Sequence, residues 1–172
     1  MFCLKRLTIF HILLLVTSNM AFGQLSEVAT GSGAYRGHIS SFNESVTVFQ
    51  GIGYAAPPVG DLRWKPPSPA IPFAGVRDAD RVGAACWQEK NSDASVYARG
   101  NLNRSEDCLY LNVFTGAERS DEGLPVMVWF HGGSNTAGHG GAQIFDGSNL
   151  AKRGAVIVTA NYRLGAFGFF AH

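Results

Sequence analysis

The 172-residue sequence predicts an α/β fold in which an antiparallel β-meander leads into a mostly parallel sheet. Two observations carry this prediction. Residues 28–55 alternate short apolar runs with turn-forming residues, which is the pattern of strands joined by tight connections. Further along, an apolar run at 125–130 is followed by a glycine-rich loop, a short helical pattern and a second apolar run at 155–160. Strand, loop, helix and strand in this order make a βα unit.

In the meander, strands are expected over 34–39 and 46–49, each bounded by glycine, serine or asparagine. The next segment, 54–69, contains five prolines. Prolines at this density exclude a central strand or a helix, because proline lacks the N–H donor that either would use. We therefore expect an extended surface arm whose Trp64 packs on the body of the protein.

Three short apolar runs follow at 109–115, 125–130 and 155–160, and nearly continuous apolar strands are typical of a sheet covered on both faces. Between the last two, residues 148–153 predict a short helix. Ser148 is the expected N-cap, and Gly154 is the expected stop signal.

The first 23 residues predict a cleaved signal peptide. Lys5 and Arg6 precede an apolar core at 7–16, and small residues lead to a cleavage point before Gln24. The alternative is a membrane anchor, but an apolar run of about ten residues is short of the roughly 20 that span a bilayer. We expect a secreted or periplasmic protein with no membrane span after cleavage.

Charge and motifs narrow the possible partners. Removal of the signal would leave 12 basic and 13 acidic residues, which gives no indication of nucleic-acid or polybasic membrane binding. The chain has no Gly-x-Gly-x-x-Gly motif and no phosphate-binding P-loop. We therefore expect no nucleic-acid partner. The oligomeric state is left open.

Two cysteines, Cys86 and Cys108, remain after the signal. An even count in an exported chain favours a disulfide, which would close a loop of about 22 residues and stabilise the fold by about 3 kcal/mol. The alternative is a pair of unrelated buried thiols.

The loop at 131–134, His-Gly-Gly-Ser, follows an apolar run directly. Small residues at the end of a buried strand can present backbone N–H groups to a developing oxyanion. The alternative is a tight turn with no chemical role. The chain contains no Gly-x-Ser-x-Gly, and the nearest match, residues 132–136, lacks the final glycine.

Four segments in order together resemble the type-B carboxylesterase, or cholinesterase-like, family of α/β-hydrolases. They are residues 49–64, residues 105–113, the loop that begins at His131, and residues 161–168. The resemblance implies that residues 24–172 are the N-terminal part of such a domain, truncated before the nucleophile elbow. The catalytic serine, acid and histidine would then lie downstream, and His131 would not be the base.

The resemblance also implies a role for the loop. Gly133 and Ser134 match the positions whose backbone N–H groups line the oxyanion hole for a small-molecule ester substrate. Ser134 as the nucleophile is a poor alternative, because it lies on a flexible loop without a strand-to-helix elbow. Asn135 departs from the family, which often has an aromatic residue there, so the shape of the substrate pocket is open.

Structural roles follow in the same way. Cys86 and Cys108 match a family disulfide, and Arg63 with Glu106 matches a buried structural ion pair. Arg163 would pair with an acid beyond residue 172. Trp87 is expected to pack and not to bind a cation.

The function implied is that of a carboxylic-ester hydrolase, inactive in this chain alone. Such an enzyme would need no cofactor and no metal. The alternatives are a non-catalytic adhesion or binding member of the same fold, or an inert truncated reading frame. The sequons at Asn43 and Asn103 have meaning only in a eukaryotic secretory pathway, and we treat both as chance matches.

Overall fold

The computed structural model describes residues 23–89 and 103–170. The predicted signal peptide, apart from Gly23, and the middle of the predicted disulfide loop at 90–102 lie outside the described residues.

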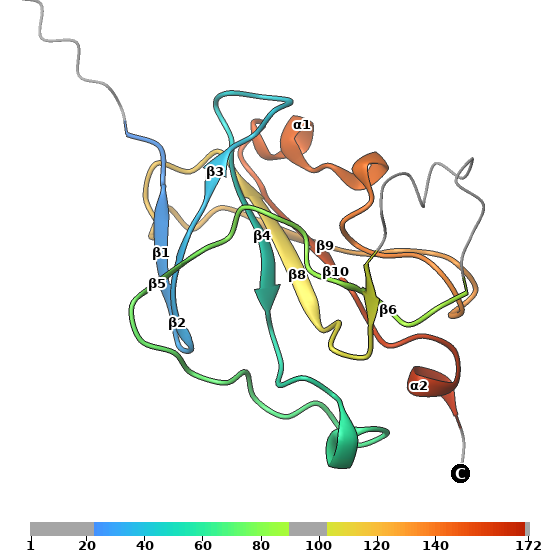
Figure 1. Ribbon diagram of the computed structural model, residues 1–172. Helices are drawn as coiled ribbons and strands as arrows, with labels where there is room; N and C mark the ends of the chain where they lie inside the picture. The colour runs from blue at the N-terminus through green and yellow to red at the C-terminus, as the bar shows by residue number, and fades with distance from the viewer. Residues whose placement is uncertain (1–22, 90–102, 171–172) are drawn as a thin grey trace, which may run out of the picture.

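The described residues form three sheets, which Figure 1 shows side by side. The order in the largest sheet is β3-β4-β8-β10-β9, formed by His38–Ile39, Thr47–Gly53, Tyr110–Thr115, Val156–Ala160 and Val126–Phe130. A three-stranded sheet contains β1 (Glu27–Thr30), β2 (Gly33–Arg36) and β5 (Val76–Asp78). A two-stranded sheet pairs β6 (Ala85–Cys86) with β7 (Arg104–Ser105).

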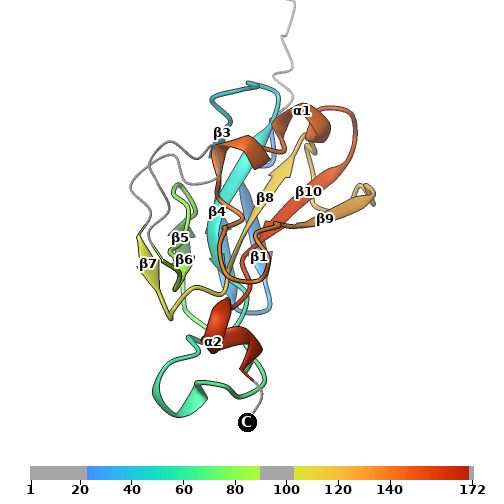
Figure 2. The ribbon, with the colours of Figure 1, turned by 90° about the vertical axis from the view of Figure 1, so that its right-hand side faces the viewer.

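The helical segments of the described residues are short and lie between or after the strands. Two are 3-10 helices, η1 at Gly60–Leu62 and η2 at Gln143–Phe145. Two are α-helices, α1 at Ser148–Ala151 and α2 at Gly165–Phe169. Figures 1 and 2 show that α1 and α2 lie at opposite ends of the largest sheet.

The largest sheet changes from antiparallel to parallel along its width. Strands β3, β4, β8 and β10 pair antiparallel in turn, and β10 then pairs parallel with β9. The expected meander is present as the β1–β2 hairpin and the β3–β4 pair. The predicted strand at 46–49 extends to Gly53, because a bulge between Phe49 and Ile52 lets the chain continue beside β8.

Three apolar clusters of described residues hold the sheet to its neighbours. One of them, Tyr35, Phe49 and Ala79, joins the three-stranded sheet to the largest sheet. At one end, Val46, Val48, Phe114 and Ile157 pack with Ala151 of α1. At the other end, the third cluster joins the cysteines to two leucines, and its buried members are Cys86, Cys108, Leu109 and Leu164.

The expected cap of α1 is wrong. The residue before the helix is Gly147, and Ser148 is already in the first turn. The carboxylate of Asp146 accepts the Ser148 N–H at 2.9 Å, so a side chain two residues earlier satisfies this free donor. The buried Ser148 hydroxyl instead pairs with the Ser40 hydroxyl at 2.7 Å. Gly154 follows the helix with φ +89°, as a stop glycine requires.

Strand β9 differs from the expectation of a sheet covered on both faces. Its side chains are 49–65% exposed, and it lies at the edge of the largest sheet in the described part of the chain.

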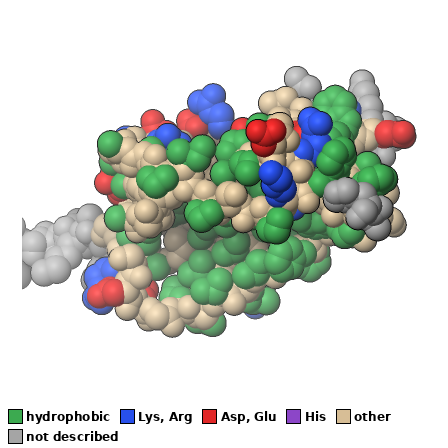
Figure 3. Space-filling view, turned by 90° about the horizontal axis from the view of Figure 1, so that it is seen from below, with side chains coloured by type: hydrophobic (Ala, Val, Ile, Leu, Met, Phe, Trp, Pro, Cys, Tyr) green, Lys and Arg blue, Asp and Glu red, His purple; other side chains and the backbone are tan. Residues whose placement is uncertain are grey.

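The proline-rich arm extends over the end of the molecule that carries α2. Trp64 of this arm donates from its indole nitrogen to the Ala166 carbonyl at 2.8 Å, although the side chain stays 47% exposed. Figure 3, which views the molecule from this end, shows apolar side chains gathered over a broad area.

Candidate functional site

The loop at 131–141 leaves β9 and turns back on itself. Gly133, Ser134 and Asn135 have φ values of +126°, +54° and +60°, a conformation that L-residues other than glycine rarely adopt. The Gly133 carbonyl accepts the N–H groups of Thr136 and Ala137 at 3.0 and 3.1 Å. A Cβ atom on Gly133 would lie 2.0 Å from the Ala137 carbonyl oxygen, so this turn requires glycine.

The tip of this loop offers two unused donors. Within residues 23–89 and 103–170, no carbonyl or side chain accepts the N–H of Gly133 or of Ser134. Both residues are exposed. Adjacent N–H groups on a constrained turn can together bind one negatively charged oxygen.

The two sides of the loop are held by the segment that follows β10. The hydroxyl of Tyr162 donates to the His131 carbonyl at 2.6 Å, and the two rings stack with centroids 4.4 Å apart. The Gly165 N–H donates to the Asn135 carbonyl at 2.7 Å. The tip is therefore exposed but fixed on both flanks.

The end of the loop is held by two buried amide side chains. Asn161, 5% exposed, accepts the Gly140 N–H at 2.7 Å and donates to the Cys108 carbonyl at 3.2 Å. Gln88, 7% exposed, binds both the N–H and the carbonyl of Gly138 at 2.8 Å. These bonds connect the loop to the region of the disulfide.

His131 is buried at the start of the loop, with 3% of its surface exposed. Its Nδ1 donates to the Gly132 carbonyl at 2.9 Å, so the proton belongs on Nδ1. Its Nε2 is buried and finds no hydrogen-bond partner among the described residues. Burial lowers the pKa of the imidazole from its ordinary value. Among the described residues, no histidine nitrogen hydrogen bonds to the Ser134 hydroxyl, so the loop itself holds no serine–histidine pair.

The two predicted structural pairs are both formed. A disulfide joins Cys86 to Cys108 with an S–S distance of 2.04 Å. Arg63 and Glu106 form two parallel hydrogen bonds of 2.7 Å, from Nε to Oε2 and from Nη2 to Oε1. The expectation that this pair is buried is wrong, because the two side chains are 38% and 22% exposed.

The expectations for Trp87 and Arg163 have different outcomes. Trp87 was expected to pack, but its side chain is 56% exposed. The Nη1 of Arg163 is buried and has no hydrogen-bond partner in the described part of the chain. Its pairing with an acid beyond residue 172 stays a prediction.

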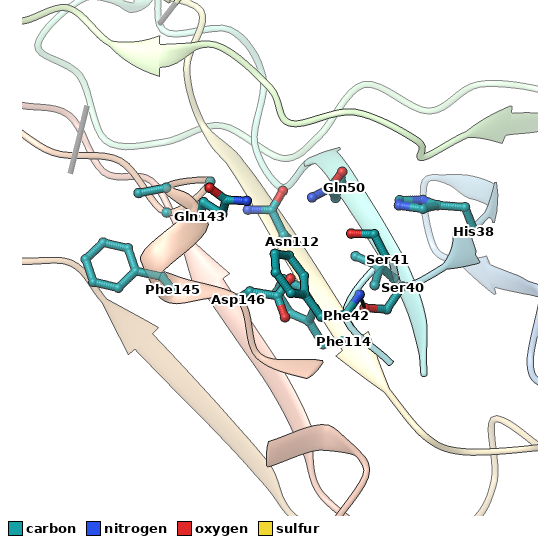
Figure 4. Close-up of a pocket in the computed structure, with 14 residues that line it drawn as sticks. His38, Ser40, Ser41, Phe42, Gln50, Asn112, Phe114, Gln143, Phe145 and Asp146 are labelled. Atoms are coloured by element: carbon teal, nitrogen blue, oxygen red, sulfur yellow. Dashed lines mark hydrogen bonds between the residues drawn. The ribbon is translucent and has the colours of Figure 1, made fainter. Parts of the chain in front are cut away.

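A separate cavity of about 330 Å³ lies between β3, β4, β8 and the segment around η2 (Figure 4). Several of its polar groups already bind the protein. The Asn112 amide bonds to Gly51 and Thr159, and Ser40 bonds to Ser148. This cavity is a polar layer of the fold, and we assign it no chemistry.

Neither a metal cluster nor a spanning helix occurs in the described ranges. No group of three or more His, Cys, Asp or Glu side chains in residues 23–89 and 103–170 is placed to hold a metal ion. No helix in these ranges is both long enough and apolar enough to cross a membrane.

Three residues that position the loop were not identified from the sequence. Gln88 and Tyr162 have no local pattern that indicates a partner 50 or 31 residues away. Asn161 and Tyr162 both lie in the segment 161–168 that carries the family resemblance, which is the one signal for them, but the resemblance attached no role to either residue.

Comparisons with known proteins agree with the resemblance. A sequence profile described as "Carboxylesterase family" matches residues 24–172. Fumonisin B1 esterase of Sphingopyxis macrogoltabida is 46% identical over 136 residues, which are 79% of this chain and 25% of that protein. Para-nitrobenzyl esterase of Bacillus subtilis (strain 168) is 49% identical over 123 residues, which are 70% of this chain and 24% of that protein.

Solved structures give the same result. A PNB esterase structure superposes with a TM-score of 0.77 at 39% identity, covering 86% of this chain and 30% of the other. A carboxylesterase of Geobacillus stearothermophilus gives a TM-score of 0.72 at 38% identity, and the match covers 84% of this chain and 27% of the other. The fold is therefore part of an α/β-hydrolase fold, and the chain spans about a quarter of the length of these curated relatives.

Proposed function

This chain belongs to the carboxylesterase family, and on that premise we propose that it forms the N-terminal part of a longer serine esterase that hydrolyses small-molecule carboxylic esters. Its proposed contribution is one side of the oxyanion hole. The observation that carries this proposal is the pair of exposed N–H groups on Gly133 and Ser134, which no described group accepts.

In the proposed mechanism, a serine from the rest of the longer protein attacks the ester carbonyl. The carbonyl oxygen gains negative charge as the tetrahedral intermediate forms, and the N–H groups of Gly133 and Ser134 donate to it. The loop is fixed before the substrate arrives, so little reorganisation is needed as charge develops. Each such donor can lower the barrier by about 3 kcal/mol. Collapse of the intermediate expels the alcohol, and water then releases the acyl group.

The relatives support an ester substrate but not a particular one. The relatives include a fumonisin B1 esterase and a para-nitrobenzyl esterase, whose names refer to different esters. Asn135 stands at the loop tip where the family often carries an aromatic residue, so the pocket next to the proposed oxyanion hole differs in shape. We propose a small-molecule ester without naming its acyl group.

Export is part of the proposal. The predicted signal at residues 1–23 would direct the chain out of the cytoplasm, and the Cys86–Cys108 disulfide would persist in an oxidising compartment.

A second candidate function is a binding or adhesion role that keeps the fold and lacks the nucleophile. The test is to purify the longer protein and measure its hydrolysis of p-nitrophenyl acetate, together with labelling by a serine-directed fluorophosphonate. The esterase proposal predicts turnover that the fluorophosphonate abolishes. Residues 24–172 alone, which lack a Gly-x-Ser-x-Gly, serve as the control and should not exceed a heat-treated sample. A longer protein with neither turnover nor labelling supports the binding role.

A further inference from the structure

Gln88 lies two residues after Cys86 and is buried, with 7% of its surface exposed. A glutamine amide carries two N–H donors and one acceptor oxygen, and when buried it needs partners for them. Its Oε1 accepts the Gly138 N–H at 2.8 Å, and its Nε2 donates to the Gly138 carbonyl at 2.8 Å. The same Nε2 donates to the Cys86 carbonyl at 3.0 Å. One side chain therefore binds both main-chain groups of a single loop residue.

The orientation of this amide is fixed by its partners. The Gly138 N–H needs an acceptor, whereas the carbonyls of Gly138 and Cys86 need donors. A flipped amide would place Oε1 against a carbonyl oxygen and the NH₂ group against an N–H. Only the observed orientation makes all three bonds.

Gly138 lies directly against the residues that lead to the proposed oxyanion donors. Its φ is +108°, and a Cβ atom there would lie 2.5 Å from His131 Nδ1 and 2.6 Å from the Gly132 carbonyl oxygen. The preceding residue, Ala137, donates its N–H to the Gly133 carbonyl at 3.1 Å. Hydrogen bonds that hold Gly138 therefore also restrain Gly133. They act through Gly132, which precedes Gly133 and lies against Gly138, and through Ala137, which bonds to the Gly133 carbonyl.

We propose that Gln88 is a positioning residue for the oxyanion loop. Its amide holds Gly138 so that the N–H groups of Gly133 and Ser134 keep one direction before the ester arrives. The bond to the Cys86 carbonyl links this restraint to the disulfide. Donors that are already aimed at the developing charge are effective because they need no reorganisation. A displacement of about 1 Å in such a site can lower the rate about 100-fold.

The proposal rests on the esterase function proposed above, and the first test uses Gln88→Met in the longer protein. Methionine keeps the length of the side chain but can make none of the three hydrogen bonds. We expect kcat to fall about 10- to 100-fold, with KM changed less than about threefold, because the loss is confined to the transition state. Affinity for a trifluoromethyl ketone, which forms an oxyanion adduct with the serine, should fall in parallel with kcat.

The matched control is Gln143→Met, the same change at an exposed glutamine beyond the loop, which should leave both quantities unchanged. A Gln88→Met protein with wild-type kcat and wild-type ketone affinity overturns the proposal.

Gln88→Glu provides a variant that tests the donors alone. At neutral pH its carboxylate keeps an acceptor for the Gly138 N–H but faces two carbonyl oxygens without a donor. Protonation at lower pH restores one O–H donor. The ratio of variant to wild-type kcat should therefore rise as the pH falls, and a ratio that stays flat contradicts the assignment.

A measurement without turnover keeps the test independent of the esterase function. Amide hydrogen exchange at Thr136 and Ala137, whose N–H groups donate to the Gly133 carbonyl, reports on hydrogen bonds that Gln88 does not itself make. Exchange there that is about tenfold faster in Gln88→Met than in wild type supports the proposal, and unchanged exchange overturns it. If the wild-type protein hydrolyses no ester, the proposed function fails, and this exchange result still decides whether Gln88 positions the loop.

Discussion

Strand β9 and the loop that follows it are neighbours in sequence but differ in their contacts. The strand is largely exposed, whereas side chains and backbone groups from other segments hydrogen bond to the loop. The side chains of Val126–Phe130 are 49–65% exposed, and in the described part of the chain this strand is paired only with β10. Within one residue, exposure falls from 65% at Phe130 to 3% at His131. From there to Gly140, hydrogen bonds from Tyr162, Gly165, Gln88 and Asn161 fix the loop.

This difference shows which interactions position the proposed donors. The strand delivers the loop to the edge of the sheet, but polar groups from outside the strand set its shape. Changes in the loop and its supports should therefore alter chemistry, whereas changes on β9 should alter little of the described structure. The predictions below test this division from the largest expected effect to the smallest.

The largest effect is expected at Gly133. A Cβ atom there would lie 2.0 Å from the Ala137 carbonyl oxygen, at a φ of +126° that alanine does not tolerate. Gly133→Ala should displace both N–H donors and lower kcat of the longer protein at least 100-fold. Gly132→Ala is the matched control, because no atom of residues 23–89 or 103–170 lies within 4 Å of a Cβ atom at that position. Equal losses in both variants would contradict a specific requirement at Gly133.

The disulfide comes next, because Gln88 and Asn161 both bond to carbonyls of its cysteines. Replacing Cys86 and Cys108 by serine should lower the free energy of unfolding by about 3 kcal/mol, the value for a closed loop of this size. Urea denaturation measures the loss, and dithiothreitol should produce a similar loss in wild type. Dithiothreitol should have no further effect on the variant, and a wild type insensitive to it would argue against the bridge.

The sequence predicted strands and turns well, but it predicted contacts between residues far apart in the chain poorly. Apolar runs located β8, β9 and β10 to within one residue, because a strand is encoded by neighbouring side chains. Glycines in the loop after β9 indicated a turn with exposed backbone, and the φ values agree.

The features that the sequence did not predict depend on tertiary partners. Gln88 reaches Gly138 across 50 residues, and no local pattern encodes that contact. The cap of α1 was misassigned because Asp146 competes with Ser148 for the same role, and only the backbone path decides between them. Burial was also misjudged, since the Arg63–Glu106 pair is correct in its partners and yet partly exposed.

The same substitution, valine to alanine, at one buried and one exposed position tests whether β9 contributes little to stability. Val48 in β4 is 2% exposed and packs against Phe114 and Ile157, whereas Val128 in β9 is 52% exposed. Val48→Ala should lower the free energy of unfolding by about 2 kcal/mol, from lost burial and the cavity left behind. Measured on residues 24–172 alone, Val128→Ala should lower it by less than about 0.5 kcal/mol, as surface changes do. Equal losses by chemical denaturation would mean that a further segment covers β9.

The smallest effect is expected at the junction itself, where His131 ends the exposed strand and begins the fixed loop. Burial lowers the pKa of its imidazole below the ordinary histidine value of 6.5. The folded state therefore binds fewer protons than the unfolded state as the pH falls through 6.5, so the stability contribution of neutral His131 is present above that pH and is lost below it. We expect the free energy of unfolding to rise with pH from about 5 to 6.5, and His131→Asn to reduce this slope. The midpoint of the His131 Hε1 resonance in an NMR titration measures the same quantity directly. A midpoint at or above 6.5 would show that the imidazole is solvated, and that the boundary between the exposed strand and the fixed loop lies further along the chain.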